Sequence, residues 1–308
     1  MRMTQFGIGS TVSRGNVRLR GGAFGVLLVL LSIVSTPAAT HTWSGAVNGL
    51  FSNAGNWSAG GVPTLAETNT LSFPGSATRF TVTNDIGALK VHAIALTGSN
   101  YIVRGASTIT VVPNLININC QGSSNTIESP LNFSGYISIV AGTGDSLILA
   151  GAVTGANGFG KTSDGDLIMR STANSFSGEV DVFAGRMIVE HSSGLGGVAD
   201  GTIVSSGATL ELRGAGMNSS EPLTLTGLGD DGLGALQTTT GNHTLSGPIT
   251  LTAETGIGVN VAANSLTLSG VVSGAGGIRK FGDGNLLLTG AANNTFTGAS
   301  FVNKGTLT

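Results

Sequence analysis

One stretch of this sequence occurs twice, and the repeat limits the possible folds more than any other feature. Residues 266–308 read LTLSGVVSGAGGIRKFGDGNLLLTGAANNTFTGASFVNKGTLT, and residues 147–189 read LILAGAVTGANGFGKTSDGDLIMRSTANSFSGEVDVFAGRMIV. Internal repeats of this length are typical of architectures in which similar units stack on one another. We take the following shared positions as structural repeat positions: Lys161, Gly165, Leu167, Phe176 and Gly178, matched by Lys280, Gly284, Leu286, Phe296 and Gly298.

Each copy reads as short strands separated by turns. The apolar run at 285–289 lies between Asp283-Gly284 and Gly290. Asp-Gly favours a turn, because glycine adopts positive φ without steric cost and aspartate tolerates it. The runs are too short for stable helices, and the flanking glycines would end them.

One copy cannot bury its apolar face alone, whereas stacked copies can, each contacting only its neighbours. The sequence therefore predicts an all-β fold, a parallel β-helix (β-solenoid) over residues 67–308, with the second repeat copy cut short at Thr308. Leu, Ile, Val and Phe would point inward, and Asn and Thr at equivalent turn positions would stack into ladders. Phe176 and Phe296, each inside an N-x-F-[ST]-G run, would lie in the core.

The later copy resembles the autotransporter-associated β-strand repeat. The residues that carry the resemblance are Lys280, Gly284, Leu286, Leu288, Gly290, Phe296, Thr297, Gly298, Gly305 and Leu307. The first copy departs from the pattern at Arg170, Ser171 and Met187, so it is a degenerate copy. The resemblance implies a right-handed parallel β-helix that is exported as a passenger, and it does not specify an activity.

The composition favours a stacked β fold over disorder and over a nucleic-acid-binding protein. The chain has 50 glycines and 10% charged residues, but its 40% hydrophobic content is too high for a disordered chain. The net charge of −2 comes without clusters of Lys and Arg, which nucleic-acid binding requires. The lone cysteine, Cys120, excludes an internal disulfide; it follows Ile116 and Ile118 at alternate positions, so all three would share the buried face of a strand.

The chain begins with a predicted signal peptide at residues 1–38. A basic segment with Arg14, Arg18 and Arg20 precedes an apolar run at 23–34, and Thr36-Pro37-Ala38 supplies small residues for cleavage. The alternative is an uncleaved anchor, but the run is short of the roughly twenty residues that span a bilayer. Export implies an extracellular or cell-surface location, with no membrane insertion by this segment.

Residues 39–66 form a distinct module that contains both tryptophans, Trp43 and Trp57. A solenoid needs a cap, because its first coil has no neighbour to cover the open end of the core. We therefore expect an N-terminal cap here. The alternative is a platform on which the indole faces stack against sugar rings.

No arrangement of residues indicates a catalytic, cofactor or metal site, so we expect none. The histidines His41, His92, His191 and His243 lack the spacing of zinc ligands. Polysaccharide-cleaving β-helices need carboxylates on adjacent coils, to bind Ca²⁺ or to act as acid and base. The candidates are Asp164, Asp166, Glu179, Asp181, Asp230, Asp231 and Asp283. Asp164 and Asp283 are explained by turns, and the Gly-rich loop with Asp230-Asp231 is a single loop rather than a tandem calcium-binding repeat.

We interpret the chain as an exported, adhesin-like structural passenger rather than an enzyme. Its partner would be a surface ligand such as a polysaccharide or another cell, and any translocator barrel would lie beyond Thr308. The alternative is an extracellular carbohydrate-binding or polysaccharide-cleaving β-helix. Three or more convergent acids, or tryptophan faces exposed together, would favour that alternative.

Overall fold

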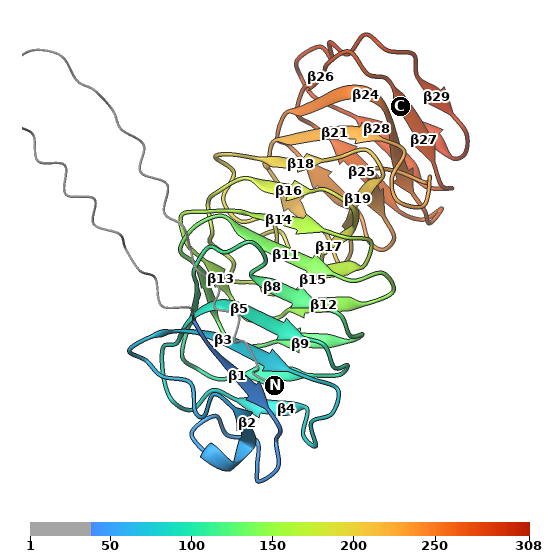
Figure 1. Cartoon of the computed structure of the whole chain (residues 1–308). Coiled ribbons are helices and arrows are strands. Elements are labelled where there is room, and N and C mark those ends of the chain that lie inside the picture. The colour runs from blue at the N-terminus through green and yellow to red at the C-terminus, as the bar shows by residue number, and fades with distance from the viewer. Residues whose placement is uncertain (1–37) are drawn as a thin grey trace, which may run out of the picture. The chain divides into compact units, whose positions relative to one another are not determined.

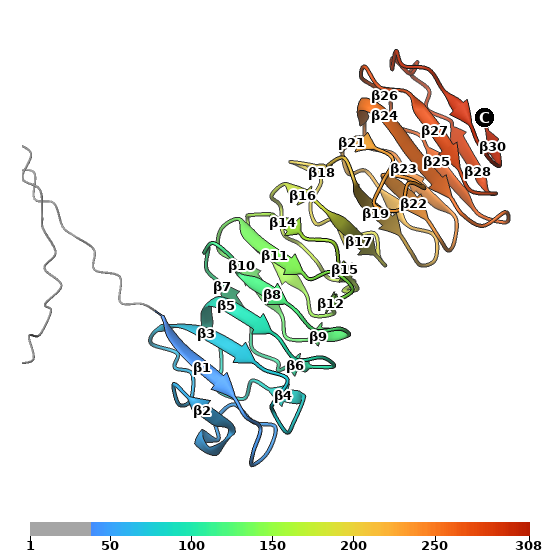
Figure 2. The same ribbon diagram turned by 45° about the vertical axis from the view of Figure 1, so that its right-hand side comes forward.

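The computed structural model describes residues 38–308, which form a parallel β-solenoid (Figures 1 and 2). Strands of successive coils pair in parallel along the length of the unit, and the only helix among these residues is the short 3₁₀ helix η1 (Ala54–Asn56). The predicted all-β solenoid is confirmed. The predicted signal peptide, 1–38, lies outside the described residues except for Ala38.

The strands stack into columns. The first column contains β1 (Ala39–Trp43), β3 (Thr68–Phe73), β5 (Lys90–Leu96), β8 (Ile118–Cys120), β11 (Ile137–Ala141), β14 (Phe159–Thr162), β16 (Val180–Val182), β18 (Thr202–Val204), β21 (Leu223–Gly227), the first part of β24 (Ile249–Val259) and β26 (Val272–Ser273). This column runs along the face that Figure 1 presents.

A second column packs beside the first. It contains β4 (Thr81–Thr83), β6 (Ile102–Arg104), β9 (Asn125–Ile127), β12 (Ser146–Leu149), β15 (Asp166–Met169), β17 (Gly185–Val189), β19 (Ala208–Leu212), β22 (Leu236–Thr238), the second part of β24, β27 (Ile278–Phe281) and β29 (Phe301–Val302). The long strand β24 joins both columns, because Ile249 pairs with Leu223 of β21 and Ile257 pairs with Leu236 of β22.

Shorter strands close the coils on the remaining side. In the first half of the solenoid they are β7 (Ile109–Val111), β10 (Leu131–Phe133) and β13 (Val153–Thr154). In the second half they are β20 (Asn218–Ser219), β23 (His243–Leu245), β25 (Ser265–Leu268), β28 (Asn285–Leu288) and β30 (Thr306–Leu307).

The apolar residues point inward because side chains alternate along each strand. In β11, Ile137 and Ile139 are buried, and Ser138 between them is not. The interior is one continuous apolar core from Trp43 to Leu286. Burial of each apolar side chain contributes roughly 1.5–3 kcal/mol, so stacking of the coils supplies most of the stability.

Polar side chains link neighbouring coils at equivalent positions, as expected for ladders of Asn and Thr. Asn132 donates to Thr154, 22 residues further along, over 3.1 Å. The repeat asparagines act alike in both copies: Asn174 accepts from the Val153 N–H, and Asn294 accepts from the Val272 N–H, each over 2.9 Å. These bonds satisfy buried backbone donors that no strand pairs.

One strand begins later than the sequence suggested. Ile116 does not share the buried face of Ile118 and Cys120; it is 41% exposed. Asn117 is buried instead, and its amide donates to the carbonyl oxygens of His92 and Val112 over 2.9 and 2.7 Å. Because this bend directs Ile116 outward, the expected alternation applies only from Ile118 onward, with Cys120 fully buried.

The N-terminal segment is continuous with the solenoid. Its strand β1 pairs in parallel with β3 and in antiparallel fashion with β2 (Trp57–Ala59). Trp43 and Trp57 pack edge to face, with ring centroids 5.1 Å apart, and both contact Phe51. The function of 39–66 as a cap, with its boundary at residue 66, stays a prediction.

Candidate functional site

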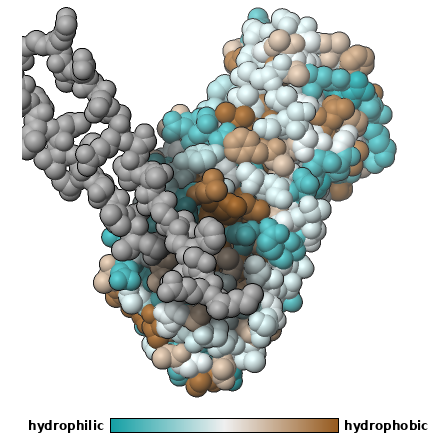
Figure 3. All heavy atoms as spheres, in the orientation of Figure 1, coloured by the Kyte–Doolittle hydropathy of each residue, from teal (hydrophilic) through white to brown (hydrophobic). Residues whose placement is uncertain are grey.

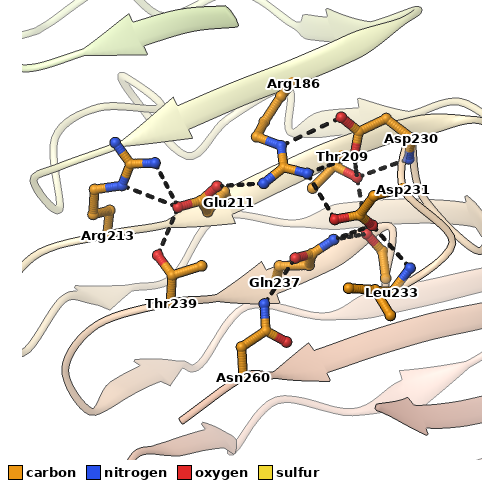
Figure 4. Close-up of polar contacts among 11 residues, drawn as sticks. Arg186, Thr209, Glu211, Arg213, Asp230, Asp231, Leu233, Gln237, Thr239 and Asn260 are labelled. Atoms are coloured by element: carbon orange, nitrogen blue, oxygen red, sulfur yellow. Dashed lines mark hydrogen bonds and ion pairs between the residues drawn. The ribbon is translucent and has the colours of Figure 1, made fainter. Parts of the chain in front are cut away.

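Four charged side chains from three segments of the chain converge beside the second column (Figure 4). Arg186 on β17 donates to Glu211 on β19 over 2.9 Å. It also donates to Asp230 over 3.0 Å and to Asp231 over 2.8 Å. Parallel register places the two strands side by side, and the loop after β21 brings in the two aspartates. We call these four residues the Arg186 cluster.

Glu211 is the most buried member of the cluster, with a fully inaccessible side chain. Its carboxylate also accepts from the guanidinium of Arg213 over 2.9 Å and from the Thr239 hydroxyl over 2.6 Å. A buried carboxylate is costly unless it is paired and hydrogen-bonded. The two arginines and the hydroxyl therefore hold Glu211 as a structural anion.

The aspartates tie the Gly-rich loop to the coils on either side. Thr209 on β19 donates to Asp230 over 2.6 Å, and Gln237 on β22 donates to Asp231 over 2.8 Å. Asn260 in turn donates to Gln237 over 3.0 Å. The network thus crosses several coils and holds the loop in one conformation (Figure 4).

Burial, hydrogen bonds and neighbouring charges shift the pKa values of two carboxyl groups in and beside the cluster. Burial alone would raise the pKa of Asp230, but hydrogen bonds from Arg186 and Thr209 outweigh it and hold that pKa below its ordinary value. Burial raises the pKa of Asp166, which lies opposite Arg186 in the neighbouring coil, and Glu211 and Asp230 add to that rise while Arg186 and Lys161 oppose it. At neutral pH Asp230 is thus an anion that already has its counter-cation, Arg186.

The structure separates most of the acids that the sequence suggested for chemistry. Only Asp230 and Asp231 converge in the Arg186 cluster, with Asp166 near them. Asp283 pairs with Lys304 over 2.7 Å, and Asp181 accepts from the Tyr136 hydroxyl. Among residues 38–308, no three His, Cys, Asp or Glu side chains are grouped as they would be around a metal ion.

The repeat lysines are buried. Lys161 donates to the carbonyl oxygens of Ser163 and Ala184 over 2.5 and 2.7 Å. Lys280 donates to Phe281, Gly282 and Lys304 carbonyl oxygens over 2.6, 2.7 and 3.2 Å. Each ammonium therefore bridges the turn of its own coil to the following coil. Burial lowers the pKa of both lysines to about 8, although nearby aspartates oppose the shift.

The repeat glycines permit close backbone contact rather than positive φ, contrary to the reason given above for Asp-Gly. A Cβ at Gly165 would lie 2.1 Å from the Gly142 carbonyl oxygen, and one at Gly178 would lie 2.1 Å from the Gly158 nitrogen. Positive φ occurs earlier in the turn, at Ser163 and Gly282. Gly284 and Gly298 are equally crowded by backbone atoms.

The remaining repeat positions are apolar. Leu167, Leu286 and Phe176 are fully buried, and the Phe176 ring packs against Phe159 with centroids 5.5 Å apart. Phe296, expected in the core, is only partly buried, because no further coil packs over its ring in the described chain.

The tryptophans offer no exposed platform, and two of the four histidines are buried. The Trp43 side chain is fully buried and Trp57 is 7% exposed, so neither indole presents a face on which a sugar could stack. Their N–H groups donate to the Arg79 and Phe51 carbonyl oxygens, each over 2.9 Å. His41 and His243 are also buried.

No pattern in the sequence points to Arg186, Glu211 or Arg213 as site residues. Glu211 lies in the run GATLEL, where it occupies an outward position of an apolar strand. The only sign of this residue's role in the sequence was a single acid within an otherwise apolar run. Its burial arises from the loop and coils that cover it, which no local pattern reports.

Comparison with known proteins supports the resemblance inferred from the repeat. The chain is 35% identical, over 167 residues, to the adhesin BmaC autotransporter of Brucella suis biovar 1 (strain 1330). The match covers 53% of this chain and 4% of that adhesin. No family model and no solved structure matches the chain. Sequence and architecture are together consistent with an autotransporter passenger β-helix, which confirms that resemblance.

No helix among residues 38–308 has the length and apolarity needed to cross a membrane.

Proposed function

We propose that this chain is an exported, adhesin-like passenger segment that presents an extended β-solenoid at the cell surface and has no chemistry of its own. The observation that carries the proposal is the similarity to an autotransporter adhesin over about half of the chain. A stacked solenoid suits this role, because each coil adds surface at a fixed spacing while the core stays continuous.

The state of the polar side chains supports a structural role. In the Arg186 cluster, each carboxylate that would have to act as acid, base or calcium ligand is paired with an arginine. General acid–base catalysis needs a carboxyl group within reach of the substrate, and Glu211 is fully buried. The polysaccharide-cleaving alternative therefore gains no support from the acids of the Arg186 cluster.

Export is the second component of the proposal. The predicted leader at 1–38 and the single cysteine both fit a protein that crosses a membrane before it folds. We propose an extracellular or cell-surface location, with anchoring by a translocator beyond Thr308.

The test uses an antibody to residues 39–308 on intact cells of the source organism. We expect external protease to remove the antigen from the cells while a cytoplasmic control protein stays intact. A band much larger than 30.6 kDa would support a passenger with further coils and an anchor. An antigen that is protected until the cells are lysed would contradict surface exposure.

A further inference from the structure

Two successive coils have no strand on the third side of the solenoid. The chain passes from β15 to β16, and again from β17 to β18, without an intervening strand, whereas the next three coils hold β20, β23 and β25 in this place. The second of these connections, residues 190–201, consists of turns and contains four glycines. We call it the strandless segment. Segments that lack strand pairing open more readily than the strands beside them.

The strandless segment covers part of the core. The Gly197 N–H donates to the Phe176 carbonyl oxygen over 2.7 Å, and a Cβ at Gly196 would lie 2.6 Å from a carbon of the Phe176 ring. Leu195 is itself only 3% exposed. Figure 3 shows hydrophobic residues in patches between hydrophilic ones on one face of the solenoid. Opening of the strandless segment would expose two further apolar side chains, Leu195 and Phe176.

A buried carboxyl group, that of Glu221, lies where this segment joins β18. Glu221 is 1% exposed, and Thr202, the first residue of β18, donates to one of its carboxyl oxygens over 2.9 Å. The other carboxyl oxygen is buried without a hydrogen-bond partner in the described chain. An ionised carboxylate in such a place is costly, and a proton on the free oxygen removes the charge.

Register places Asp200, at the end of the strandless segment, beside Glu221. Thr202 pairs with Leu223, and its N–H donates to the Pro222 carbonyl oxygen over 2.9 Å. Two residues before this pair, Asp200 and Glu221 occupy equivalent places on adjacent coils. Burial raises the pKa of Glu221 to about 7; Thr202 opposes the rise and the charge of Asp200 adds to it.

No cation offsets these acids from the preceding coils or from the segment that carries Glu221. Glu179, one coil before Asp200, adds a third acid, and none of the three forms an ion pair with a residue in the range 38–308. The strandless segment contains no Lys or Arg. Arg213, the one Lys or Arg in residues 213–222, pairs with Glu211 over 2.9 Å.

The following coil also brings no charge to Glu221. Gly247 lies against the Glu221 backbone, where a Cβ would be 2.2 Å from the Glu221 carbonyl oxygen. The titratable group of this coil is His243, whose ring bonds to the Met217 N–H and the Thr240 carbonyl oxygen. Burial lowers the pKa of His243, although Thr240 opposes the shift. The contribution of neutral His243 to stability is therefore lost as pH falls, which is the opposite of the behaviour expected from Glu221.

We propose that Glu221 is a proton-dependent switch for the strandless segment: its protonated carboxyl group keeps residues 190–201 closed over Phe176, and ionisation opens them. Ionisation leaves a buried charge beside Asp200 without a cation. Movement of the strandless segment admits water to that charge and breaks no strand pairing. Each coil contacts only its neighbours, so the opening stays local.

The test is hydrogen–deuterium exchange of the purified chain between about pH 5 and pH 8, read by mass spectrometry. Each rate is divided by the intrinsic exchange rate at the same pH. Protection of residues 190–201 should fall by up to about tenfold per pH unit between the ordinary pKa of 4.5 and about 7, and should then level off. Protection of β11 should not change. A profile without this fall, or an equal fall in all strands, would overturn the proposal.

Substitutions separate the switch from a purely structural role. Glu221→Gln, which cannot ionise, should remove the fall in protection. Asp200→Asn should make the fall smaller and end it at a lower pH, because the repelling charge is gone. Glu128→Gln, at an exposed acid on an earlier coil, is the matched control and should behave like the wild type. The same fall in Glu221→Gln as in the wild type would refute the assignment. If Glu221→Gln does not fold, Asp200→Asn decides, and an unchanged profile in that variant would refute it.

The switch goes beyond the proposed function and does not depend on it. It is tested on purified protein, whereas surface exposure is tested on cells. Failure of either result therefore leaves the other one interpretable.

Discussion

The ammonium of Lys161 lies 2.7 Å from the carbonyl oxygen of Ala184, the residue that precedes Gly185 in the next coil. A Cβ at Gly185 would lie 2.5 Å from that ammonium. The second copy repeats the arrangement, with Lys280 bonded to the Lys304 carbonyl oxygen before Gly305. Lysine and glycine therefore recur together in the repeat because the glycine leaves room for the lysine head group.

Lys161→Met should destabilise the solenoid. Methionine fills a similar volume but leaves the Ser163 and Ala184 carbonyl oxygens without their donor, at about 1–3 kcal/mol for each group left unsatisfied. Urea unfolding followed by circular dichroism measures the loss. Lys304→Met is the control; its ion pair with Asp283 is exposed, so we expect a change below about 1 kcal/mol. Equal effects of the two substitutions would argue against the carbonyl contacts.

Glu221 should make stability depend on pH. Its side chain is buried, Thr202 donates to one carboxyl oxygen over 2.9 Å, and the other oxygen has no partner. Burial raises its pKa to about 7, Thr202 opposes the shift and Asp200 adds to it. The folded chain therefore holds the proton more tightly than the unfolded chain does. The contribution of protonated Glu221 to the free energy of unfolding is fully present below the ordinary pKa of 4.5. This contribution is lost as the pH rises through about 7.

The difference between wild type and Glu221→Gln isolates this effect, because the other titrating groups are common to both. The free energy of unfolding should fall with pH in the wild type, by at most about 1.4 kcal/mol per pH unit, and should fall less in the variant. Parallel pH profiles for the two proteins would show that Glu221 titrates normally.

Asp230→Asn combined with Asp231→Asn should lower stability by about 1–2 kcal/mol, because Arg186 loses charge-assisted hydrogen bonds in a partly exposed setting. Since both aspartates already pair with Arg186, the loss should be the same in Ca²⁺ and in chelator. Thermal unfolding in both conditions is the measurement. A melting temperature of the wild type that rises with Ca²⁺, and a double variant that does not respond, would instead establish a calcium site.

The two repeat phenylalanines should differ in their contribution to stability. Phe176→Ala removes a fully buried ring and should cost about 3–5 kcal/mol. Phe296→Ala should cost less, because its ring is only partly covered. Chemical unfolding of both variants gives the comparison, and a larger loss for Phe296 would contradict the described packing.

Much of the fold could be predicted because its signals are local. Alternating apolar residues in runs such as 137–141 placed inward and outward side chains, and glycine-rich turns separated the strands. Ile116 was misplaced because the bend at Asn117 depends on hydrogen bonds from its side chain to the carbonyl oxygens of nearby Val112 and of His92, which lies 25 residues away.

The candidate site was less predictable. Asp230 and Asp231 stood out as an acid pair, but their partner Arg186 lies 44 and 45 residues away. No periodicity links residues at that separation. The contact arises because β17 and β19 pair in register and the loop after β21 folds over them.

The sequence by itself determined the class of the fold: repeated turns and period-two apolar runs can bury their surface only by stacking coils. The tertiary structure decided which polar groups meet. Alternation assigns a side chain to a face, but its neighbours in the next coil depend on register, which the loops between coils set. That register buried Lys161 against Ala184 and paired Arg186 with Glu211.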